Sequence, residues 1–169
     1  MIYTIAGFMG SGKSTLGRLL SSRMEGSTFI DLDEHLEQMT GRKIPDIFRE
    51  DGENVFRGLE TEALIDAVSS YEGGTMFLSL GGGTLLRPGN REIIRAVSHC
   101  IYLRGTAGTL AEHLGDGSGR PVLQQGSSLE ALLQSRIPIY ESAARYIVDI
   151  DGKTPEMLAE EIETLLKDS

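Results

Sequence analysis

The residues with the clearest chemical signal lie near the start of the sequence, where 7–15 read Gly-Phe-Met-Gly-Ser-Gly-Lys-Ser-Thr. They fit the pattern G-x-x-x-x-G-K-[ST], in which backbone N–H groups surround a phosphate, the lysine reaches the β- and γ-phosphates and the hydroxyl ligates Mg²⁺. The alternative is a chance glycine turn. However, an apolar run (2–6) precedes the pattern and helical spacing of leucines follows it. We therefore expect a nucleoside triphosphate to be bound by Gly10, Ser11, Gly12, Lys13, Ser14 and Thr15.

Two carboxylates, Asp31 and Asp33, stand at the end of a second apolar run (28–32). Beside a bound triphosphate, such a pair suggests a metal contact and a proton acceptor. The alternative is that Asp33 caps the helix expected over 33–39. Next to the phosphate-binding loop, we favour the functional interpretation.

Three consecutive glycines, Gly81, Gly82 and Gly83, follow a third apolar run (75–80). They could be a plain break between a strand and a turn. Three in a row exceed what a turn needs, and glycine lets a ligand approach the backbone closely. We therefore expect a ligand beside them.

Strand and helix patterns alternate along the whole chain, which predicts an α/β fold with a parallel sheet. We expect a three-layer αβα arrangement and one domain over 1–169, with five strands at 2–6, 28–32, 75–80, 99–103 and 146–150. The helices are expected at 16–24, 33–39, 44–51, 53–70, 89–97, 106–114, from 129 onward (continuing or restarting at 140–144) and from a capping Thr154. Because ligands of such sheets lie at the carboxyl ends of the strands, the three features above should meet at one edge.

The composition narrows the possible partners and compartments. The chain has 169 residues and a net charge of −9, which argues against sequence-independent binding of nucleic acid. Cys100 is the single cysteine, so no intrachain disulfide can form, and its apolar surroundings favour a buried core residue over a nucleophile. There is no signal-peptide pattern and no apolar run near the ~20 residues of a membrane span. We expect a cytoplasmic monomer without a membrane partner.

Taken together, these motifs resemble those of the shikimate kinases. The resemblance covers nearly the whole chain in the family's order. It rests on the loop at 7–15, Asp-Leu-Asp at 31–33, Ile-Phe-x-x-x-Gly-Glu-x-x-Phe-Arg-x-x-Glu at 47–60, Leu-Gly-Gly-Gly at 80–83, Arg-Pro-Val-Leu at 120–123, and Arg136 with Tyr140.

The resemblance implies a nucleoside-monophosphate-kinase-like fold with a P-loop core, a substrate-binding segment at about 33–60 and a flexible lid at about 112–124. It implies transfer of the γ-phosphoryl group of ATP to the 3-hydroxyl of shikimate, in aromatic amino-acid synthesis. ATP and shikimate would then be the small-molecule partners, and Mg²⁺ the cofactor.

Roles also follow from the resemblance, position by position. Lys13, Asp33 and Arg120 would be catalytic: Asp33 holds substrate hydroxyls and accepts the proton, and Arg120 meets the transferred phosphoryl group and ATP. Ser14 would ligate Mg²⁺, and Asp31 would orient it through water. The substrate contacts would be Asp33, Arg57, Gly81, Gly82, Gly83 and Arg136, with the two arginines on the carboxylate. Glu53 and Glu60 would support Arg57, and Phe48 and Phe56 would wall the ring.

The sequence departs from the family at the nucleotide base. His113 stands where the family usually has an arginine that stacks on adenine. Lys153 and Pro155 are kept where the family closes the other side of the base, so we expect them to bind ATP.

Two other functions remain open from the sequence. One is a kinase for another small hydroxy acid such as gluconate, against which the segment 47–60 argues. The other is a relative that binds nucleotide without catalysis. A dinucleotide-binding loop is excluded, because its pattern requires glycine where Thr15 stands.

Overall fold

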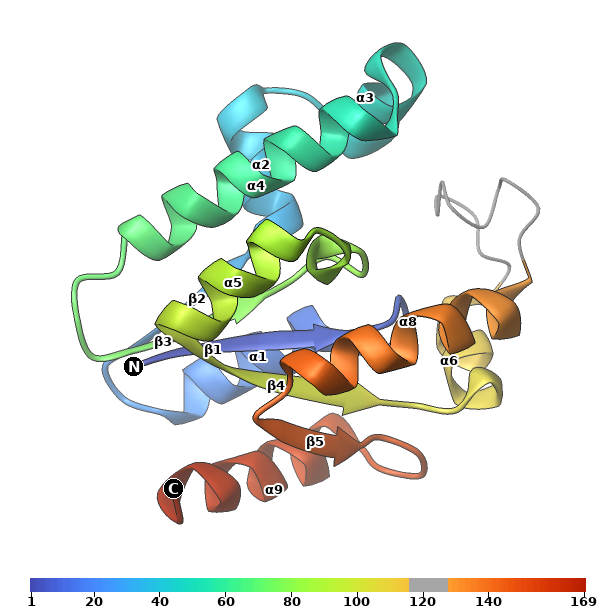
Figure 1. Cartoon of the computed structure of the whole chain (residues 1–169). Coiled ribbons are helices and arrows are strands. Elements are labelled where there is room, and N and C mark those ends of the chain that lie inside the picture. The colour runs from blue at the N-terminus through green and yellow to red at the C-terminus, as the bar shows by residue number, and fades with distance from the viewer. Residues whose placement is uncertain (116–127) are drawn as a thin grey trace.

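The fold is organised around one parallel sheet with the strand order β2-β3-β1-β4-β5 (Figure 1). It is seen in a computed structural model that describes residues 1–115 and 128–169. The strands are β1 (Ile2–Gly7), β2 (Ser27–Asp31), β3 (Thr75–Ser79), β4 (Ser98–Arg104) and β5 (Tyr146–Asp149). The five predicted strands are confirmed, and no end moves by more than one residue.

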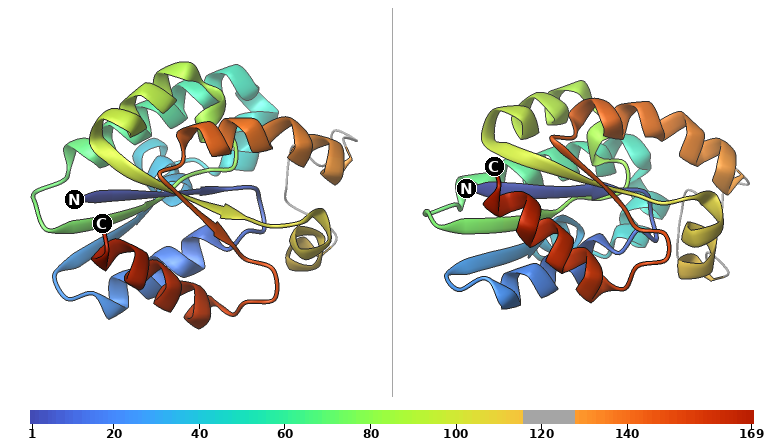
Figure 2. Two further views of the ribbon diagram at one scale, coloured as in Figure 1. Left: turned by 60° about the horizontal axis from the view of Figure 1, so that its bottom comes forward. Right: turned by 90° about the horizontal axis from the view of Figure 1, so that it is seen from below.

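Helices cover both faces of this sheet, as predicted. The helical segments are α1 (Lys13–Arg23), α2 (Leu32–Thr40), α3 (Ile44–Asp51), α4 (Glu53–Ser69), the 3₁₀ turn η1 (Thr84–Leu86), α5 (Pro88–Val97), α6 (Ala107–Leu114), α8 (Leu129–Ala143) and α9 (Pro155–Lys167). Figure 2 shows α1 and α9 together on one face, with α5 and α8 on the other. Helix α4 lies beside α5, and α2 and α3 pack on α4.

The central strands are apolar along their length because helices bury both of their sides. In β3 every residue after Thr75 is buried, whereas the edge strand β2 is only partly covered. Strands β1 and β3 pair in a register that places Tyr3 opposite Phe77, and their rings stack with centroids 5.7 Å apart. Cys100 is buried in β4, as expected.

Two glycines explain how β1 turns into α1. Gly10 and Gly12 have φ angles of +82° and +85°, a region that residues with a Cβ rarely adopt. Farther along, α1 lies close to the sheet at Gly17, where an added Cβ would be 2.4 Å from the ring of Phe29. The loop and the helix packing therefore both depend on glycine.

Helix boundaries differ from the sequence prediction at two places near the site. Helix α2 begins at Leu32, and Asp31, not Asp33, is its N-cap, with the side chain accepting from the N–H of Glu34 at 3.0 Å. The alternative that Asp33 caps this helix, which the sequence analysis did not favour, is therefore wrong. The 3₁₀ turn η1 was not predicted, since three residues give no periodicity.

Helix α8 runs without interruption through Pro138. The alternative of a restart at 140–144 was wrong. Buried side chains on both sides of the proline, including Leu133 and Tyr140, hold the two halves against the sheet.

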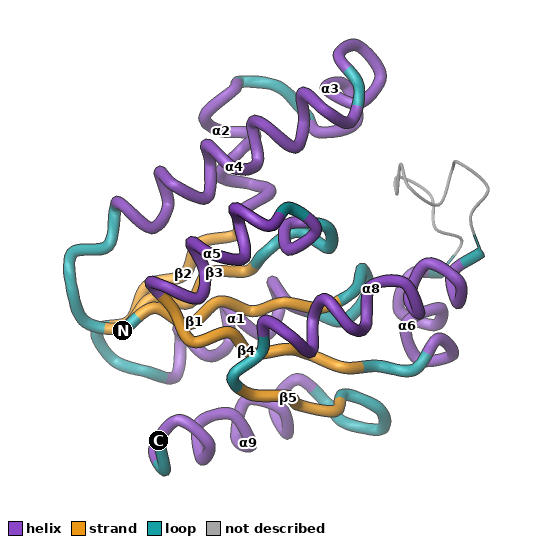
Figure 3. The backbone as a smooth tube through the Cα atoms, viewed as in Figure 1, coloured by secondary structure: helices purple, strands orange, loops and turns teal. Residues whose placement is uncertain are grey.

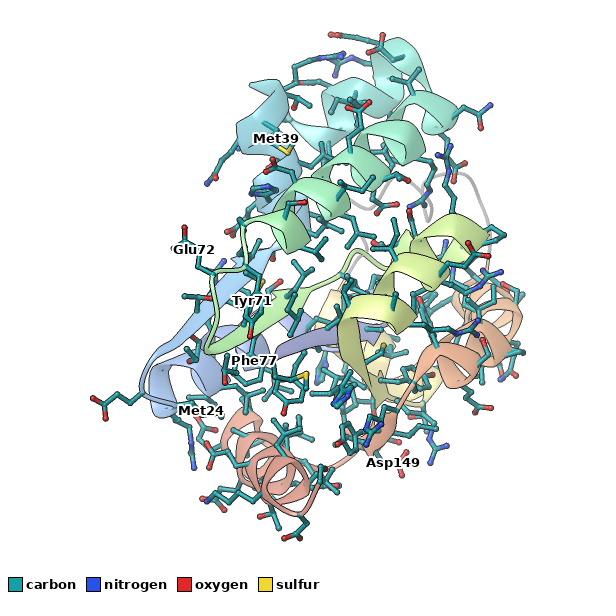
Figure 4. The ribbon with its side chains drawn as sticks, turned by 60° about the vertical axis from the view of Figure 1, so that its left-hand side comes forward. Met24, Met39, Tyr71, Glu72, Phe77 and Asp149 are labelled. Atoms are coloured by element: carbon teal, nitrogen blue, oxygen red, sulfur yellow. The ribbon has the colours of Figure 1, made fainter. Side chains whose placement is uncertain are left out.

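The segments that follow β1, β2 and β3 emerge at the same end of the sheet, as Figure 3 shows in teal and purple. At the opposite end, the turn from α4 to β3 is fixed by Tyr71, whose hydroxyl donates to the carbonyl of Gly74 at 2.9 Å (Figure 4). Within 1–115 and 128–169, no helix is long and apolar enough to cross a membrane.

Candidate active site

The loop between β1 and α1 forms the floor of a large cavity. Lys13 donates from Nζ to the carbonyls of Gly7 and Phe8, at 3.1 and 3.2 Å. These bonds hold the ammonium group over the loop. All six of the residues predicted to bind the triphosphate line this cavity, namely Gly10, Ser11, Gly12, Lys13, Ser14 and Thr15.

Three oxygen-bearing side chains meet beside the loop. The Ser14 hydroxyl donates to the carboxylate of Asp31 and lies 3.2 Å from the hydroxyl of Ser79. Hydroxyl and carboxylate oxygens are the ligands that Mg²⁺ prefers. Ser79 was not singled out from the sequence. The available signal was a polar residue in the last position of an otherwise apolar strand, directly before Leu80 and the glycines.

Asp33 lies in the first turn of α2 and faces two adjoining cavities. The larger has a volume of about 550 Å³ and the smaller about 120 Å³. Four residues line both: Met9, Asp33, Gly81 and Gly82. Two ligands, one in each cavity, would therefore meet next to Asp33.

The environment of Asp33 favours its neutral form more than water would. Burial, followed by the negative charges of Glu60 and Asp31, raises its pKa from 3.8 to about 6, against the lowering effect of Lys13. A carboxylate with a pKa near the working pH is suited to accept a proton.

Arg57 is a buried side chain of the smaller cavity, with 8% of the residue exposed. Its Nη1 donates to Oε1 of Glu60 at 2.9 Å, and Nη2 to Oε1 of Glu53 at 3.5 Å. Its guanidinium also lies over the ring of Phe56, 5.1 Å from the centroid. The ion pair of Arg57 with Glu60 is therefore not a surface pair, because both residues are removed from solvent.

Phe48 and Phe56 wall the same cavity, with ring centroids 4.6 Å apart. Helices α3 and α4 supply one ring each, and Gly52 forms the turn between these helices. The apolar wall was anticipated from the sequence. Ile44, a further apolar residue of this lining, was not.

Arg136 reaches the smaller cavity from α8 and is 4% exposed. Its Nη1 donates to the carbonyl of Gly82 at 3.4 Å, and its guanidinium lies 5.6 Å from the ring centroid of Phe8. Among the residues that the structure describes, no carboxylate forms an ion pair with it. A buried cation is costly without an anion, so this arrangement favours an anionic ligand.

Tyr140 fixes the glycine segment from the same helix. Its hydroxyl donates to the carbonyl of Gly82 at 2.5 Å, and burial raises the pKa of this phenol to about 12. The phenol therefore stays protonated and keeps donating. The sequence placed Tyr140 in a motif but gave it no role.

The glycines at 81–83 are explained by close neighbours. A Cβ at Gly81 would lie 2.9 Å from Glu60 Oε2 and 3.0 Å from Asp33 Oδ1. At Gly83 it would lie 2.4 Å from Nη2 of Arg57. At Gly82 nothing comes nearer than 3.6 Å. Two of the three glycines therefore make room for the charged side chains of the site.

His113, Lys153 and Pro155 also line the larger cavity. His113 donates from Nδ1 to the carbonyl of Gly10 at 2.7 Å, which fixes its tautomer. Lys153 pairs with Glu161 at 2.7 Å. Arg120 lies outside the described residues. Of the predicted lid at about 112–124, residues 112–114 are the last residues of α6.

The family described as "SKI: Shikimate kinase" matches residues 9–167. The chain belongs to the shikimate kinase family. A shikimate kinase of Dictyoglomus turgidum is 41% identical, over 98% of this chain and 96% of its own length. One of Thiobacillus denitrificans is 43% identical, over 86% and 79%. The family predicted from the sequence is confirmed, and with it the activity class, a kinase.

A solved structure shows the same fold. It is described as shikimate kinase from Acinetobacter baumannii in complex with shikimate, and it aligns with a TM-score of 0.87 and 30% identity. The alignment covers 99% of this chain and 92% of that one. The predicted α/β P-loop kinase fold is confirmed.

Proposed function

We propose that this chain transfers the γ-phosphoryl group of ATP to the 3-hydroxyl of shikimate. The observation that carries the proposal is the pair of buried arginines, Arg57 and Arg136, in a small cavity that meets the P-loop cavity at Asp33. One cavity is suited to a triphosphate and the other to a small hydroxylated carboxylic acid. The membership of the shikimate kinase family selects shikimate among such acids.

Each described residue then has a distinct task. Arg57 and Arg136 hold the substrate carboxylate, while the backbone at Gly81, Gly82 and Gly83 contacts the ring. Asp33 binds the reacting hydroxyl and accepts its proton as the oxygen attacks the γ-phosphorus and the bond to the β-phosphate oxygen breaks. Lys13 neutralises charge on the phosphates. Such positioning and charge neutralisation are the main needs of phosphoryl transfer.

A divalent metal fits the residues present. Ser14 would ligate Mg²⁺ directly and Asp31 would act through water, and both offer the hard oxygen ligands that this ion prefers. When bound, Mg²⁺ supplies positive charge to the phosphates. Asp31 is oriented for this task by the N–H of Glu34.

The proposal also assigns roles to the nucleotide side of the site and to the two segments around it. Arg120 would meet the transferred phosphoryl group from a lid at about 112–124, and residues 33–60 would form the substrate-binding segment. His113, Lys153 and Pro155 would surround the adenine. The enzyme would act as a cytoplasmic monomer. Light scattering after size-exclusion chromatography measures the mass in solution and so tests the monomeric state.

The test is a coupled assay of ADP release, with and without Mg²⁺, using shikimate, gluconate and the carboxamide analogue of shikimate. We expect full activity with shikimate, weak activity with its carboxamide analogue and none with gluconate. Arg57→Lys should raise KM for shikimate at least tenfold with little change in KM for ATP, because lysine lacks the planar fork that matches a carboxylate. The matched control is Arg23→Lys, which alters an arginine that pairs with Glu163 between α1 and α9.

Three results would contradict the proposal. Turnover of gluconate without turnover of shikimate would favour a kinase for another hydroxy acid. ATP binding without ADP release on any acceptor would favour a non-catalytic relative. An unaltered KM for shikimate in Arg57→Lys would show that Arg57 and Arg136 do not form a clamp for the substrate carboxylate.

A further inference from the structure

The buried carboxylate of Glu60 has a partner on each oxygen. Glu60 is 1% exposed, and its Oε1 accepts from Arg57. Its Oε2 accepts from the hydroxyl of Thr84 at 2.9 Å, and Thr84 is fully buried. Thr84 opens the 3₁₀ turn directly after the glycine segment, so this bond links η1 to Glu60 of α4, which lines the smaller cavity.

Thr84 is held in turn by a second pair of bonds. Asn90, which is 1% exposed in α5, donates from Nδ2 to the carbonyl of Thr84 at 2.9 Å. Its Oδ1 lies 2.9 Å from the hydroxyl of Thr61, whose other acceptor is the carbonyl of Arg57 at 3.2 Å. The bonds therefore lead from the side chain of Arg57 through η1 and α5 back to α4.

This circuit restricts the Arg57 guanidinium through its bond to Glu60. The guanidinium is also so close to Gly83 that a Cβ there would be 2.4 Å from Nη2. A buried carboxylate held at only one oxygen can rotate about its terminal torsion, whereas one held at both cannot. The Thr84 hydroxyl thus decides which way Glu60, and with it Arg57, is turned.

We propose that Thr84, held in place by Asn90 and Thr61, is a positioning residue for recognition of the substrate carboxylate. It touches no substrate. It acts by orienting Glu60, which orients Arg57 in the small cavity. This inference rests on the proposed function, since it requires that Arg57 binds the carboxylate.

The test compares two substitutions at one position. Thr84→Val keeps the shape and removes the hydroxyl, and Thr84→Ser keeps the hydroxyl and removes a methyl group. We expect Thr84→Val to raise KM for shikimate about tenfold, the lower end of the range for a hydrogen bond to a charged group, with kcat and KM for ATP within about twofold. Thr84→Ser should restore KM to near the wild-type value.

The control for loss of a buried hydroxyl is Thr4→Val. Thr4 is also fully buried, and its hydroxyl pairs with Ser98 at 3.1 Å within the sheet. Thr4→Val should lower the melting temperature without changing KM for shikimate. A second variant, Thr61→Val, removes the link to Asn90 and should raise KM for shikimate less than Thr84→Val does, so the inference stays testable if Thr84→Val fails to fold.

If Thr84 had only a structural role, its substitution would affect substrates with and without a carboxylate equally. The comparison of shikimate with its carboxamide therefore tests the positioning role. On the carboxamide analogue, Thr84→Val should lose little activity relative to wild type, because that ligand has no carboxylate for Arg57 to bind. In a double-mutant cycle, Thr84→Val should cost much less in the Arg57→Lys background than in wild type.

The outcomes separate this inference from the function on which it rests. If wild type does not phosphorylate shikimate, the proposed function has failed. If wild type does and Arg57→Lys raises KM, but Thr84→Val leaves KM for shikimate unchanged, the positioning role is overturned. Equal losses in Thr84→Ser and Thr84→Val, equal losses on acid and amide, or additive effects with Arg57→Lys overturn it as well.

Discussion

Replacing Gly83 by alanine should weaken substrate binding by displacing the neighbouring side chain of Arg57. Gly83 has φ −110°, which alanine adopts readily, so the backbone is not strained. The new Cβ would lie 2.4, 2.6 and 2.7 Å from Nη2, Nη1 and Cζ of Arg57. Ordinary contact begins near 3.4 Å, so the guanidinium must withdraw by roughly 1 Å.

The magnitude follows from what that displacement breaks. Arg57 is bound to Glu60 at 2.9 Å, and a withdrawal of this size exceeds the range of a good hydrogen bond. Losing a charge-assisted bond costs about 1.5–3 kcal/mol, or about 10- to 100-fold in affinity. We expect KM for shikimate to rise by this factor, while KM for ATP changes less than about twofold.

The assay is ADP release at saturating ATP, with calorimetric titration of shikimate as a direct measure of binding. The matched control is Gly58→Ala, one residue from Arg57 on α4, where an added Cβ meets no atom within 4 Å. Gly82→Ala, with nearest atoms at 3.6 Å, should fall between the two. A folded Gly83→Ala enzyme whose KM for shikimate stays within twofold of wild type would refute the steric argument.

Three further predictions concern the proton acceptor, the packing of α1 and the nucleotide base. Because the pKa of Asp33 is raised to about 6, kcat/KM should fall as the pH drops below about 6. Asp33→Asn should lower kcat by more than 99%, and the remaining activity should lack this pH dependence. The folded-state pKa lies above the unfolded value, so ionisation lowers stability as the pH rises from about 4 to 6; Asp33→Asn should therefore raise the unfolding free energy by about 1–2 kcal/mol at pH 8 but not at pH 4, in denaturant titrations. Gly17→Ala should lower the unfolding free energy by about 1–3 kcal/mol, since its Cβ would press on the ring of Phe29, whereas Gly58→Ala should raise it by about 0.5–1 kcal/mol; equal shifts in both would contradict the packing account. His113→Arg should tighten ATP binding a few-fold in calorimetry by adding a cation–π contact of about 0.5–2 kcal/mol, and unchanged or weaker binding would argue against residue 113 on the adenine.

Patterns with a clear period or a fixed spacing were sufficient to predict the fold. The alternation of apolar runs and helical faces gave all five strands, and the phosphate-binding loop was complete within nine residues. Thr154 was correctly expected to cap α9, where it accepts from the N–H of Met157 at 3.2 Å. These features are local, so the sequence is enough to recognise them.

Features that depend on contacts between distant segments could not be predicted in this way. Asp31 and Asp33 flank Leu32 in the sequence, and only the point at which β2 ends decides which of the two caps α2. The contact of Ser79 with Ser14 joins residues 65 positions apart, and that of Thr84 with Glu60 joins residues 24 apart. No spacing rule links them, because the sheet and η1 bring them together.

The shared wall of the two cavities has a consequence for inhibitor chemistry. Met9, Asp33, Gly81 and Gly82 belong to both cavities, so no protein layer separates them at that wall. A single compound that joins an adenosine phosphate to a ring carboxylate through a short linker could therefore occupy both at once. Its second half would bind at the high effective concentration set by the linker, and affinity should exceed that of either half by about 10²–10⁴-fold. Such a compound should compete with both ATP and the carboxylic acid, and Arg57→Lys should remove the advantage of the joined form.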